Sequence, residues 1–310
     1  MTNISSTDAL ADVLKTIRLS ASAYFCEDFT SPWGMDVARG EQGVFHVIIK
    51  GSCLLQVATE QVLELEQGDI VAFPRGAAHW ISDQQKSVRM PVTEVVEKVL
   101  SGENPFNSVV ESSRLDITLL CGAFDYDSSI DHPFVKELPE FIHIRAADTP
   151  SLDWLRTIVM VLSSESRVPS PGSTVMVDRI TELLFIQLIR FHMASQNRDM
   201  GYMAALADRQ IGQALNLIHG ESKACLSVES LADAVALSRT AFSEKFSKMV
   251  GLSAKRYLLD WRMQRAKVNL AQNKMSTQLV AEFAGYSSEA AFSKAFKQFF
   301  NISPGQAKKL

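Results

Sequence analysis

Short apolar segments separated by turn residues fill the stretch from Val44 to Ile81. The breaks fall at Lys50-Gly51-Ser52, Glu66-Gln67-Gly68-Asp69 and Pro74-Arg75-Gly76. Apolar runs of this length, bounded by Gly, Pro, Asp and Ser, are typical of short antiparallel strands. The pattern therefore predicts an antiparallel barrel or sandwich, with no long helix, in this part of the chain.

Two strongly apolar helical patterns follow, at 151–164 and 173–194, and the breaker run 168–172 separates them. They predict a helical hairpin. One face of the second helix carries an apolar stripe, and further apolar residues widen it: Val177, Ile180, Leu184, Leu188 and Phe191, then Leu183, Phe185, Ile186 and Ile189. A helix that is apolar nearly all round is buried on two sides. The second cover is either a second subunit, which predicts a homodimer, or the chain's own core.

The last hundred residues contain an internal repeat with a spacing of 50 positions. Residues 238–253 align with 288–303, and six of these sixteen positions are identical. In each copy a Ser precedes a helix that has two Phe four residues apart, and Gly251 or Asn301 stands where the helix should end. A short amphipathic segment precedes each copy, at 228–235 and 277–284. The pattern predicts two helix-turn-helix motifs.

Composition and charge favour a globular protein of about two domains, one of them basic. With 310 residues, 46% of them apolar and 21% charged, the chain is long enough for about two domains. No uninterrupted apolar run reaches the length of a membrane helix, so we expect a soluble, cytoplasmic protein that makes no membrane contact. Residues 1–207 carry 16 basic and 27 acidic side chains, whereas 208–310 carry 15 and 8. This basic C-terminal segment suits a region that neutralises phosphates.

The C-terminal sequence resembles a known family. "LADAVALSRTAFSEKFSKMVGLSAKRYLLDWRMQRAKVNL" followed by "VAEFAGYSSEAAFSKAFKQFFNISP" is similar to the paired DNA-binding module of the AraC/XylS family of bacterial transcription regulators. The resemblance covers about residues 208–310. It implies recognition helices at 239–250 and 289–300, a rigid linker helix at 257–269, double-stranded operator DNA and RNA polymerase as partners, and activation as the usual direction of control.

Helix periodicity indicates which side chains reach DNA, because the Phe stripes take the buried faces. The opposite faces carry Thr240, Ser243, Glu244 and Ser247, and Ala290, Ser293, Lys294 and Lys297. The family's base-reading positions match Thr240, Ser243, Glu244, Ala290, Ser293 and Lys294. Glu289 lies at the start of the second helix, while Arg239, Lys248, Lys255 and Lys297 suit phosphates.

The two predicted turns differ at one position. The first has Ala236 where the second has Gly285. If this position takes a positive φ, Ala costs about 1 kcal/mol there, and the first turn is slightly strained.

The N-terminal sequence resembles a second family. "GDIVAFPRGAAH" and, upstream, "FHVIIKGSCLL" are similar to the motifs of cupin barrels, in particular the small cupin domains fused to AraC-type modules. Metal-binding cupins use two His and a Glu in the first motif and a His in the second. Here His46 is present, but Ile48 takes the place of the second His and no Glu follows. A zinc-type set of His46, His79, Cys121 and His132 stays open, as does a ligand cavity lined by two neutral His.

The cysteines offer a second kind of chemistry. Cys26 and Cys121 stand where the resemblance to the reactive-chlorine-sensing group implies redox cysteines, so an oxidant is one candidate effector. A reactive thiol needs a lowered pKa, and the acidic neighbours Glu27 and Asp28 of Cys26 argue against one. Cys53 and Cys225 are expected to be structural.

Together these patterns predict a multidomain α+β protein: an N-terminal cupin-like β-barrel with a helical hairpin and a C-terminal all-α double helix-turn-helix module. The expected boundaries are 1–147 for the effector-sensing domain, 148–198 for the hairpin and linker, and 208–310 for the DNA-binding domain. The predicted function is a sequence-specific transcription regulator, controlled by a small molecule, metal or oxidant. The alternatives are a cupin metalloenzyme, an isomerase or dioxygenase, with a helical appendage, and a protein-binding adaptor.

Overall fold

The chain folds into two compact units. A computed structural model describes residues 8–58, 61–107, 117–127, 132–147, 153–168, 170–195, 200–220, 226–272 and 275–309. We call one unit the barrel unit; it comprises Leu19–Ser128 and Leu138–Ser195. The other, the helical unit, comprises Met1–Arg18, Ser129–Glu137 and Gln196–Leu310.

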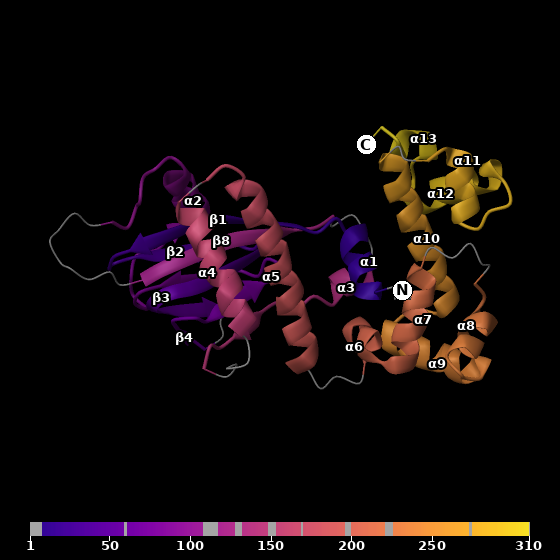
Figure 1. The fold of residues 1–310 in the computed structure, drawn as a ribbon, viewed down its shortest axis with the longest axis horizontal. Helices are drawn as coiled ribbons and strands as arrows, with labels where there is room; N and C mark the ends of the chain where they lie inside the picture. Colours follow the sequence, from indigo (N-terminus) through magenta and orange to yellow (C-terminus); the bar gives the residue numbers. More distant parts are fainter. Residues whose placement is uncertain are drawn as a thin grey trace. The chain divides into compact units, whose positions relative to one another are not determined.

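As far as its residues are described, the barrel unit is a curled sheet accompanied by the helices α2, α4 and α5 (Figure 1). Along the chain its elements are β1 (Ser20–Phe29), β2 (Gly34–Val37), β3 (Gly43–Val57), β4 (Leu63–Glu66), β5 (Ile70–Phe73), β6 (His79–Ser82), β7 (Met90–Pro91), α2 (Val92–Leu100), β8 (Ile117–Asp125), β9 (Ile142–Ile144), α4 (Asp153–Arg167) and α5 (Ser173–Ser195). The strand order is β1-β8-β3-β6-β2-β7; β4 and β5 also pair with β3, and β9 pairs with β5.

Strand β3 organises the sheet because its two halves pair with different strands. Residues 44–47 pair with β5, and residues 54–57 pair with β6. Between them the register against β8 shifts between Ile48 and Lys50, and Gly51 has φ 84°. The prediction of a turn at residues 50–52 is therefore wrong, because β3 runs through these residues. The positive φ of Gly51 bends the strand without ending it, so β3 passes from one part of the sheet to the other.

The core of this unit fills the inside of the curled sheet. Phe29 is fully buried, and its ring lies 5.7 Å from Trp33 and 5.1 Å from Phe106. On the outer face Phe45 stacks on Phe124 at 4.9 Å, and Phe124 contacts Phe185 of α5 at 4.8 Å. Aromatic side chains thus fix α5 against the sheet.

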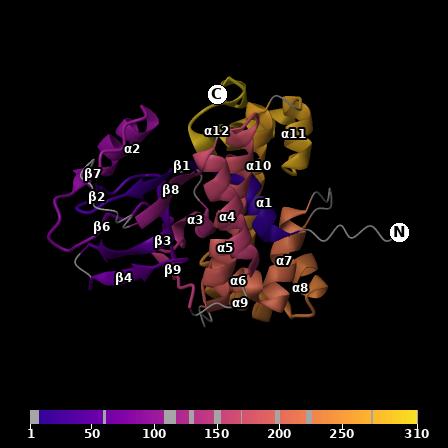
Figure 2. The same cartoon turned by 60° about the vertical axis from the view of Figure 1, so that its left-hand side comes forward.

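Helices α4 and α5 form the predicted hairpin and lie side by side across the sheet (Figures 1 and 2). Val177, Leu184 and Leu188 of α5 are buried as the apolar stripe predicts. Met176 and Leu183 are 44% and 49% exposed, so the chain's own core covers only part of the apolar surface of α5.

The helical unit is built around one long helix, α10 (Ala254–Ala271). Figure 1 shows α10 running from a group containing α6 (Tyr202–Ala207), α7 (Arg209–His219), α8 (Val228–Ala234) and α9 (Arg239–Val250) to a group containing α11 (Thr277–Phe283), α12 (Glu289–Phe300) and α13 (Pro304–Ala307). The observed α9 and α12 have the predicted bounds, and α10 contains the predicted linker helix.

Two segments of the expected N-terminal domain belong to this helical unit. They are α1 (Ala9–Thr16) and α3 (Pro133–Lys136). The backbone N–H of Ala9 donates to the Asn216 side chain of α7 at 2.7 Å. The structure therefore departs from an undivided domain at 1–147, because these two segments pack on the helices of the C-terminal region.

No helix within the described ranges is long and apolar enough to span a membrane.

Candidate functional site

The local sequence fixes both ends of α9. The Ser238 hydroxyl accepts the backbone N–H of Ala241, and Gly251 ends the helix with φ 77°. Phe242 and Phe246 are fully buried, and their rings lie 5.5 Å apart. Because two residues four positions apart share a helix face, this burial turns the opposite face of α9 outward.

Helix α12 repeats this arrangement. Ser288 caps its first turn by accepting the N–H of Ala291, and Asn301 ends it in the left-handed conformation with φ 59°. Phe292 and Phe296 are fully buried with rings 5.4 Å apart. The predicted caps and stops of both repeats are confirmed.

The predicted DNA-binding side chains lie on the outward faces of these two helices. Nearly all of them are exposed. The exposed residues of α9 are Arg239, Thr240, Glu244, Ser247 and Lys248, and those of α12 are Glu289, Ala290, Lys294 and Lys297. Ser243 and Ser293 are half-buried, and the Ser243 hydroxyl donates to the Arg239 carbonyl at 2.8 Å. Each helix therefore presents short polar side chains flanked by longer charged ones.

Several cations on these faces are available for phosphates. Among the described residues, Arg239, Lys248, Lys294 and Lys297 form no ion pair, nor does the exposed Lys255 in the first turn of α10. By contrast, Lys245 points inward, with its ammonium 2.8 Å from Asp208 and 3.0 Å from Gln210. Exposed cations without acidic partners attract a polyanion at low desolvation cost.

The turn before α9 contains a conformationally strained alanine. Ala236 has φ 55°, whereas Gly285 has φ 83° at the corresponding turn before α12. The sequence therefore located the strain correctly. We expect Ala236→Gly to raise the free energy of unfolding of the helical unit by about 1 kcal/mol. Urea denaturation checks this. Ala234→Gly, two residues earlier in α8, should instead lower it by about 1 kcal/mol, and equal effects of the two substitutions would contradict the account.

A buried hydrogen-bond cluster, which we call the Tyr257 hub, fixes the start of α10. The Tyr257 hydroxyl lies 2.7 Å from the His219 Nε2, 2.7 Å from the Tyr202 hydroxyl and 3.1 Å from the His132 Nε2. His219 donates from Nδ1 to the Ala9 carbonyl at 3.2 Å, so its Nε2 accepts from Tyr257.

The other two members of the hub donate to Tyr257. His132 accepts the N–H of Phe134 at Nδ1, so its Nε2–H donates to the Tyr257 oxygen. The Tyr202 hydroxyl also donates a hydrogen bond to this oxygen. The Tyr257 oxygen thus donates once and accepts twice, its full capacity. Burial holds the pKa of His219 well below its usual range, so the imidazole is neutral. Sequence reasoning missed this hub, although His219 at the end of an apolar helix was an available signal.

Inside the barrel unit, His46, His79 and Cys121 come together as predicted. His46 Nε2 lies 2.8 Å from His79 Nε2, and His46 Nδ1 lies 3.0 Å from the Cys121 sulfur. His79 uses Nδ1–H to donate to the Ala77 carbonyl at 2.8 Å, which makes its Nε2 an acceptor. A directional chain follows: the thiol donates to His46, and His46 donates to His79. We call it the imidazole chain.

This geometry does not fit a metal. The Cys121 sulfur and His79 Nε2 approach different nitrogens of the His46 ring, which point in different directions and cannot face one ion. Within the described residues no group of three or more His, Cys, Asp or Glu is arranged to hold a metal ion. His132 does not join the set, because both its ring nitrogens already form hydrogen bonds, to the Phe134 N–H and to the Tyr257 hydroxyl. The described residues therefore do not assemble the four-ligand set of His46, His79, Cys121 and His132; His46 and His79 are instead neutral imidazoles, because burial lowers both pKa values.

The thiols lie on opposite faces of the sheet. Cys121 opposes Phe25 in the β1/β8 register and faces inward, whereas Cys26, the next residue along β1, contacts the Ser163 hydroxyl of α4 at 3.2 Å. Burial raises the pKa of Cys26, partly offset by Ser163 and Arg167, and burial raises the pKa of Cys121 further. This arrangement favours unreactive thiols and does not position a Cys26–Cys121 disulfide. Buried Cys53 fits its expected structural role, and Cys225 lies outside the described residues.

A double helix-turn-helix module with outward polar faces, joined to a curled β-barrel, defines a DNA-binding protein with a separate second domain. Comparison with known families agrees. The family described as Cupin matches residues 8–194, and the helix-turn-helix domain family matches residues 231–309. The chain belongs to the cupin family in its N-terminal region and carries a helix-turn-helix domain of the AraC type.

Relatives match over nearly the whole chain. The HTH-type transcriptional regulator AlkR of Acinetobacter baylyi is 28% identical over 301 residues, 96% of this chain and 97% of AlkR. The RCS-specific HTH-type transcriptional activator RclR of Escherichia coli is 24% identical, covering 89% of this chain and 88% of RclR. A solved AraC-type regulator from Chromobacterium violaceum is 27% identical over 34% of this chain and 94% of that chain, with TM-score 0.32. The relatives are regulators, which argues against the metalloenzyme alternative.

Proposed function

We propose that this DNA-binding transcriptional regulator reads its operator through α9 and α12 in neighbouring major grooves. The observation that supports this most strongly is the repeated geometry of the two helices, each with buried Phe on one face and polar side chains on the other. Recognition helices that read one side of B-form DNA contact grooves about 34 Å apart. The rigid α10 suits this task, because it fixes the distance between the two motifs.

The outward side chains divide into two proposed classes. Base edges are read by short or directional groups: Thr240, Ser243, Glu244, Ala290, Ser293 and Lys294. Phosphates are bound by Arg239, Lys248, Lys255 and Lys297, while Ser247 and Glu289 border the contact. Glu accepts from cytosine and Lys donates to guanine, whereas phosphate contacts carry no sequence information.

Neighbouring lysines of α12 test this division. Lys294→Ala is expected to weaken operator binding by about 1–3 kcal/mol while sparing random DNA, because it removes a base contact. Lys297→Ala should weaken binding to both DNAs alike and reduce the salt slope by about 1. Fluorescence anisotropy with operator and scrambled duplexes at several salt concentrations measures both.

Lys98→Ala in α2 serves as the matched control, because Lys98 pairs with Glu94 at 2.9 Å in the barrel unit. It should leave both affinities unchanged. Equal losses on operator and scrambled DNA for Lys294→Ala would overturn its assignment as a base-reading residue.

The proposed direction of control is activation, with RNA polymerase as the protein partner in the cytoplasm. The name of RclR, an activator, supports this assignment. Run-off transcription from the operator-bearing promoter tests it: the regulator should increase transcript yield, and a decrease would identify a repressor.

We also propose that the protein acts as a homodimer through the exposed face of α5. Val175 is 64% exposed, Met176 44% and Leu183 49%, and large apolar side chains grouped on a helix surface favour a partner. Sedimentation equilibrium of the full chain checks this, with a dimer expected and a monomer at micromolar concentration contradicting it.

For the barrel unit we propose effector sensing by a bound small molecule. A small molecule is favoured over an oxidant because burial raises the pKa of the Cys26 and Cys121 thiols, and the thiolate is the reactive form. Supporting it over a metal, the imidazole chain uses its nitrogens for internal hydrogen bonds. Mass spectrometry after mild oxidant should find Cys26 and Cys121 still reduced, and rapid modification of either would restore the redox hypothesis.

A further inference from the structure

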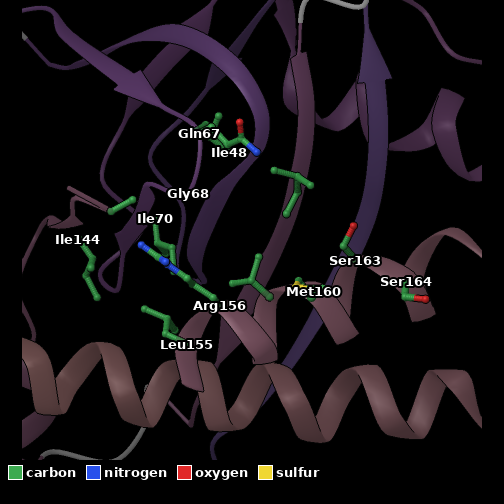
Figure 3. A pocket seen from close by; sticks show the side chains of 13 residues that line it. Ile48, Gln67, Gly68, Ile70, Ile144, Leu155, Arg156, Met160, Ser163 and Ser164 are labelled. Carbon is green, nitrogen blue, oxygen red and sulfur yellow. The ribbon is translucent and has the colours of Figure 1, made fainter. Parts of the chain in front are cut away.

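A cavity of about 500 Å³ opens between α4 and the edge of the sheet in the barrel unit (Figure 3). Its walls come from β3, the turn between β4 and β5, the β5/β9 pair and one face of α4. This place differs from the imidazole chain, which lies inside the curled sheet. The volume falls within the range of small-molecule sites, about 300–1,000 Å³.

The floor of the cavity is aliphatic. Ile70 and Ile144 face each other across the β5/β9 register, and both are almost completely buried. From α4, Leu155 and Val159 close the opposite wall, because residues four apart share a helix face. A ligand that fills this space therefore gains most of its affinity from an apolar body.

A bulge in β3 contributes to the wall. The register against β8 shifts between Ile48 and Lys50, so Ile49 is the extra residue, and Ile49 lines the cavity. Bulges re-aim side chains and recur next to binding sites. Gly68, whose N–H donates to the Ile48 carbonyl at 2.7 Å, holds the adjacent turn against the same point of β3.

One charged side chain lines this apolar space. Among the described residues that line the cavity, Arg156 is the only charged one. Figure 3 shows its guanidinium extending toward Ile70, while Met160 and Ser163 lie farther along the cavity. Arg156 has no ion pair among the described residues, and its exposed position leaves the guanidinium open to a ligand. A guanidinium favours a carboxylate, which it binds through two parallel hydrogen bonds.

We propose that this cavity binds an apolar monocarboxylate, with the carboxylate on Arg156 and the apolar body against Ile70, Ile144, Leu155 and Val159. The proposal rests on the proposed role of the barrel unit in effector sensing and names the chemical class of that effector. Because α4 supplies one wall of the cavity, a bound ligand contacts both α4 and the sheet and stabilises their packing. Helix α4 is followed in the chain by α5, and α5 is the last element of the barrel unit before the helices α6–α13.

Isothermal titration calorimetry of the full chain with decanoate and decanol tests the proposal. We expect saturable binding of one decanoate per chain. Arg156→Gln should weaken decanoate binding about tenfold, since it removes a charged hydrogen-bond donor, and leave decanol binding unchanged. Val159→Trp, which fills the cavity, should abolish binding of both. Arg179→Gln, a control at an exposed arginine of α5 outside the cavity, should alter neither.

Three outcomes overturn the proposal: no saturable decanoate binding, equal losses for Arg156→Gln and Arg179→Gln, or normal decanoate binding to Val159→Trp. Operator binding of the unmodified chain without decanoate is measured in parallel. Failure of the calorimetry with intact operator binding rejects this cavity alone, whereas absent operator binding rejects the proposed function itself.

Discussion

Replacing Tyr257 with Phe is expected to lower the free energy of unfolding of the helical unit by about 3 kcal/mol. The substitution removes one oxygen and leaves three buried groups without their partner: the His219 Nε2 acceptor and the N–H and O–H donors of His132 and Tyr202. Each buried polar group that loses its hydrogen bond costs about 1–3 kcal/mol, and partial relaxation keeps the total below the sum. Urea denaturation followed by circular dichroism measures the change.

Tyr286→Phe is the matched control. Tyr286 packs against Phe292 at 5.7 Å near the start of α12 and is half-buried, outside the hub. Its loss of a hydroxyl should cost less than about 0.5 kcal/mol. Similar effects of the two substitutions would mean that the Tyr257 hydroxyl is not the centre of a satisfied network.

Acidification is expected to destabilise the barrel unit through the imidazole chain. Burial lowers the pKa of His79 to about 4 and that of His46 well below its usual value of 6.5. Above pH 6.5 both rings are neutral in the folded and unfolded chain, so their full contribution is present. Between pH 6.5 and 4 His46 and His79 become protonated in the unfolded chain but stay neutral in the folded chain. The free energy of unfolding therefore falls as the pH is lowered.

The size of this effect follows from the His79 shift. A pKa lowered from 6.5 to about 4 corresponds to about 3 kcal/mol lost by pH 4. Urea denaturation at pH 7 and at pH 4.5 measures most of it. His79→Asn removes the titrating ring, so the variant should lose less stability over the same interval. An unchanged pH dependence in this variant would contradict the hydrogen-bond chain as described.

The helices of the C-terminal region could be predicted almost to the residue because local chemistry fixes them. Ser238 and Ser288 cap their helices, and Gly251 and Asn301 end them in the left-handed conformation. These signals lie within a few residues of the elements that they define. The strain at Ala236 was predictable for the same reason, since the predicted turn of the second motif has Gly285 at the corresponding place.

The errors arose where distant parts of the chain decide the outcome. Gly51 looks like a turn residue, yet pairing of the residues around it with β8 and β4 keeps β3 continuous. His132 was grouped with the barrel histidines by residue type, whereas Tyr257, 125 positions later, determines its place. Neither the strand pairing of β3 nor the His132–Tyr257 hydrogen bond can be recognised from the residues next to it in the sequence.

The Tyr257 hub and the Arg156 cavity were both absent from the sequence predictions for the same physical reason. The hub joins residues of α6, α7 and α10 with the segment before α3, and the cavity joins one helix face to two strand pairs. Periodicity shows that a face is apolar, but it does not show that neighbouring faces leave space between them. Such sites become visible only when the packing is known.

The most direct test of the account is genome-wide footprinting of the purified full-length protein on its source DNA. If α9 and α12 read adjacent major grooves, discrete sites will appear, each with two protected segments one helical turn, about 10.5 base pairs, apart. Substitutions in α9 and in α12 will then affect different halves of each site. Uniform, sequence-independent protection, or discrete sites with a single protected segment, would contradict the central claim that two recognition helices on one rigid linker read the operator.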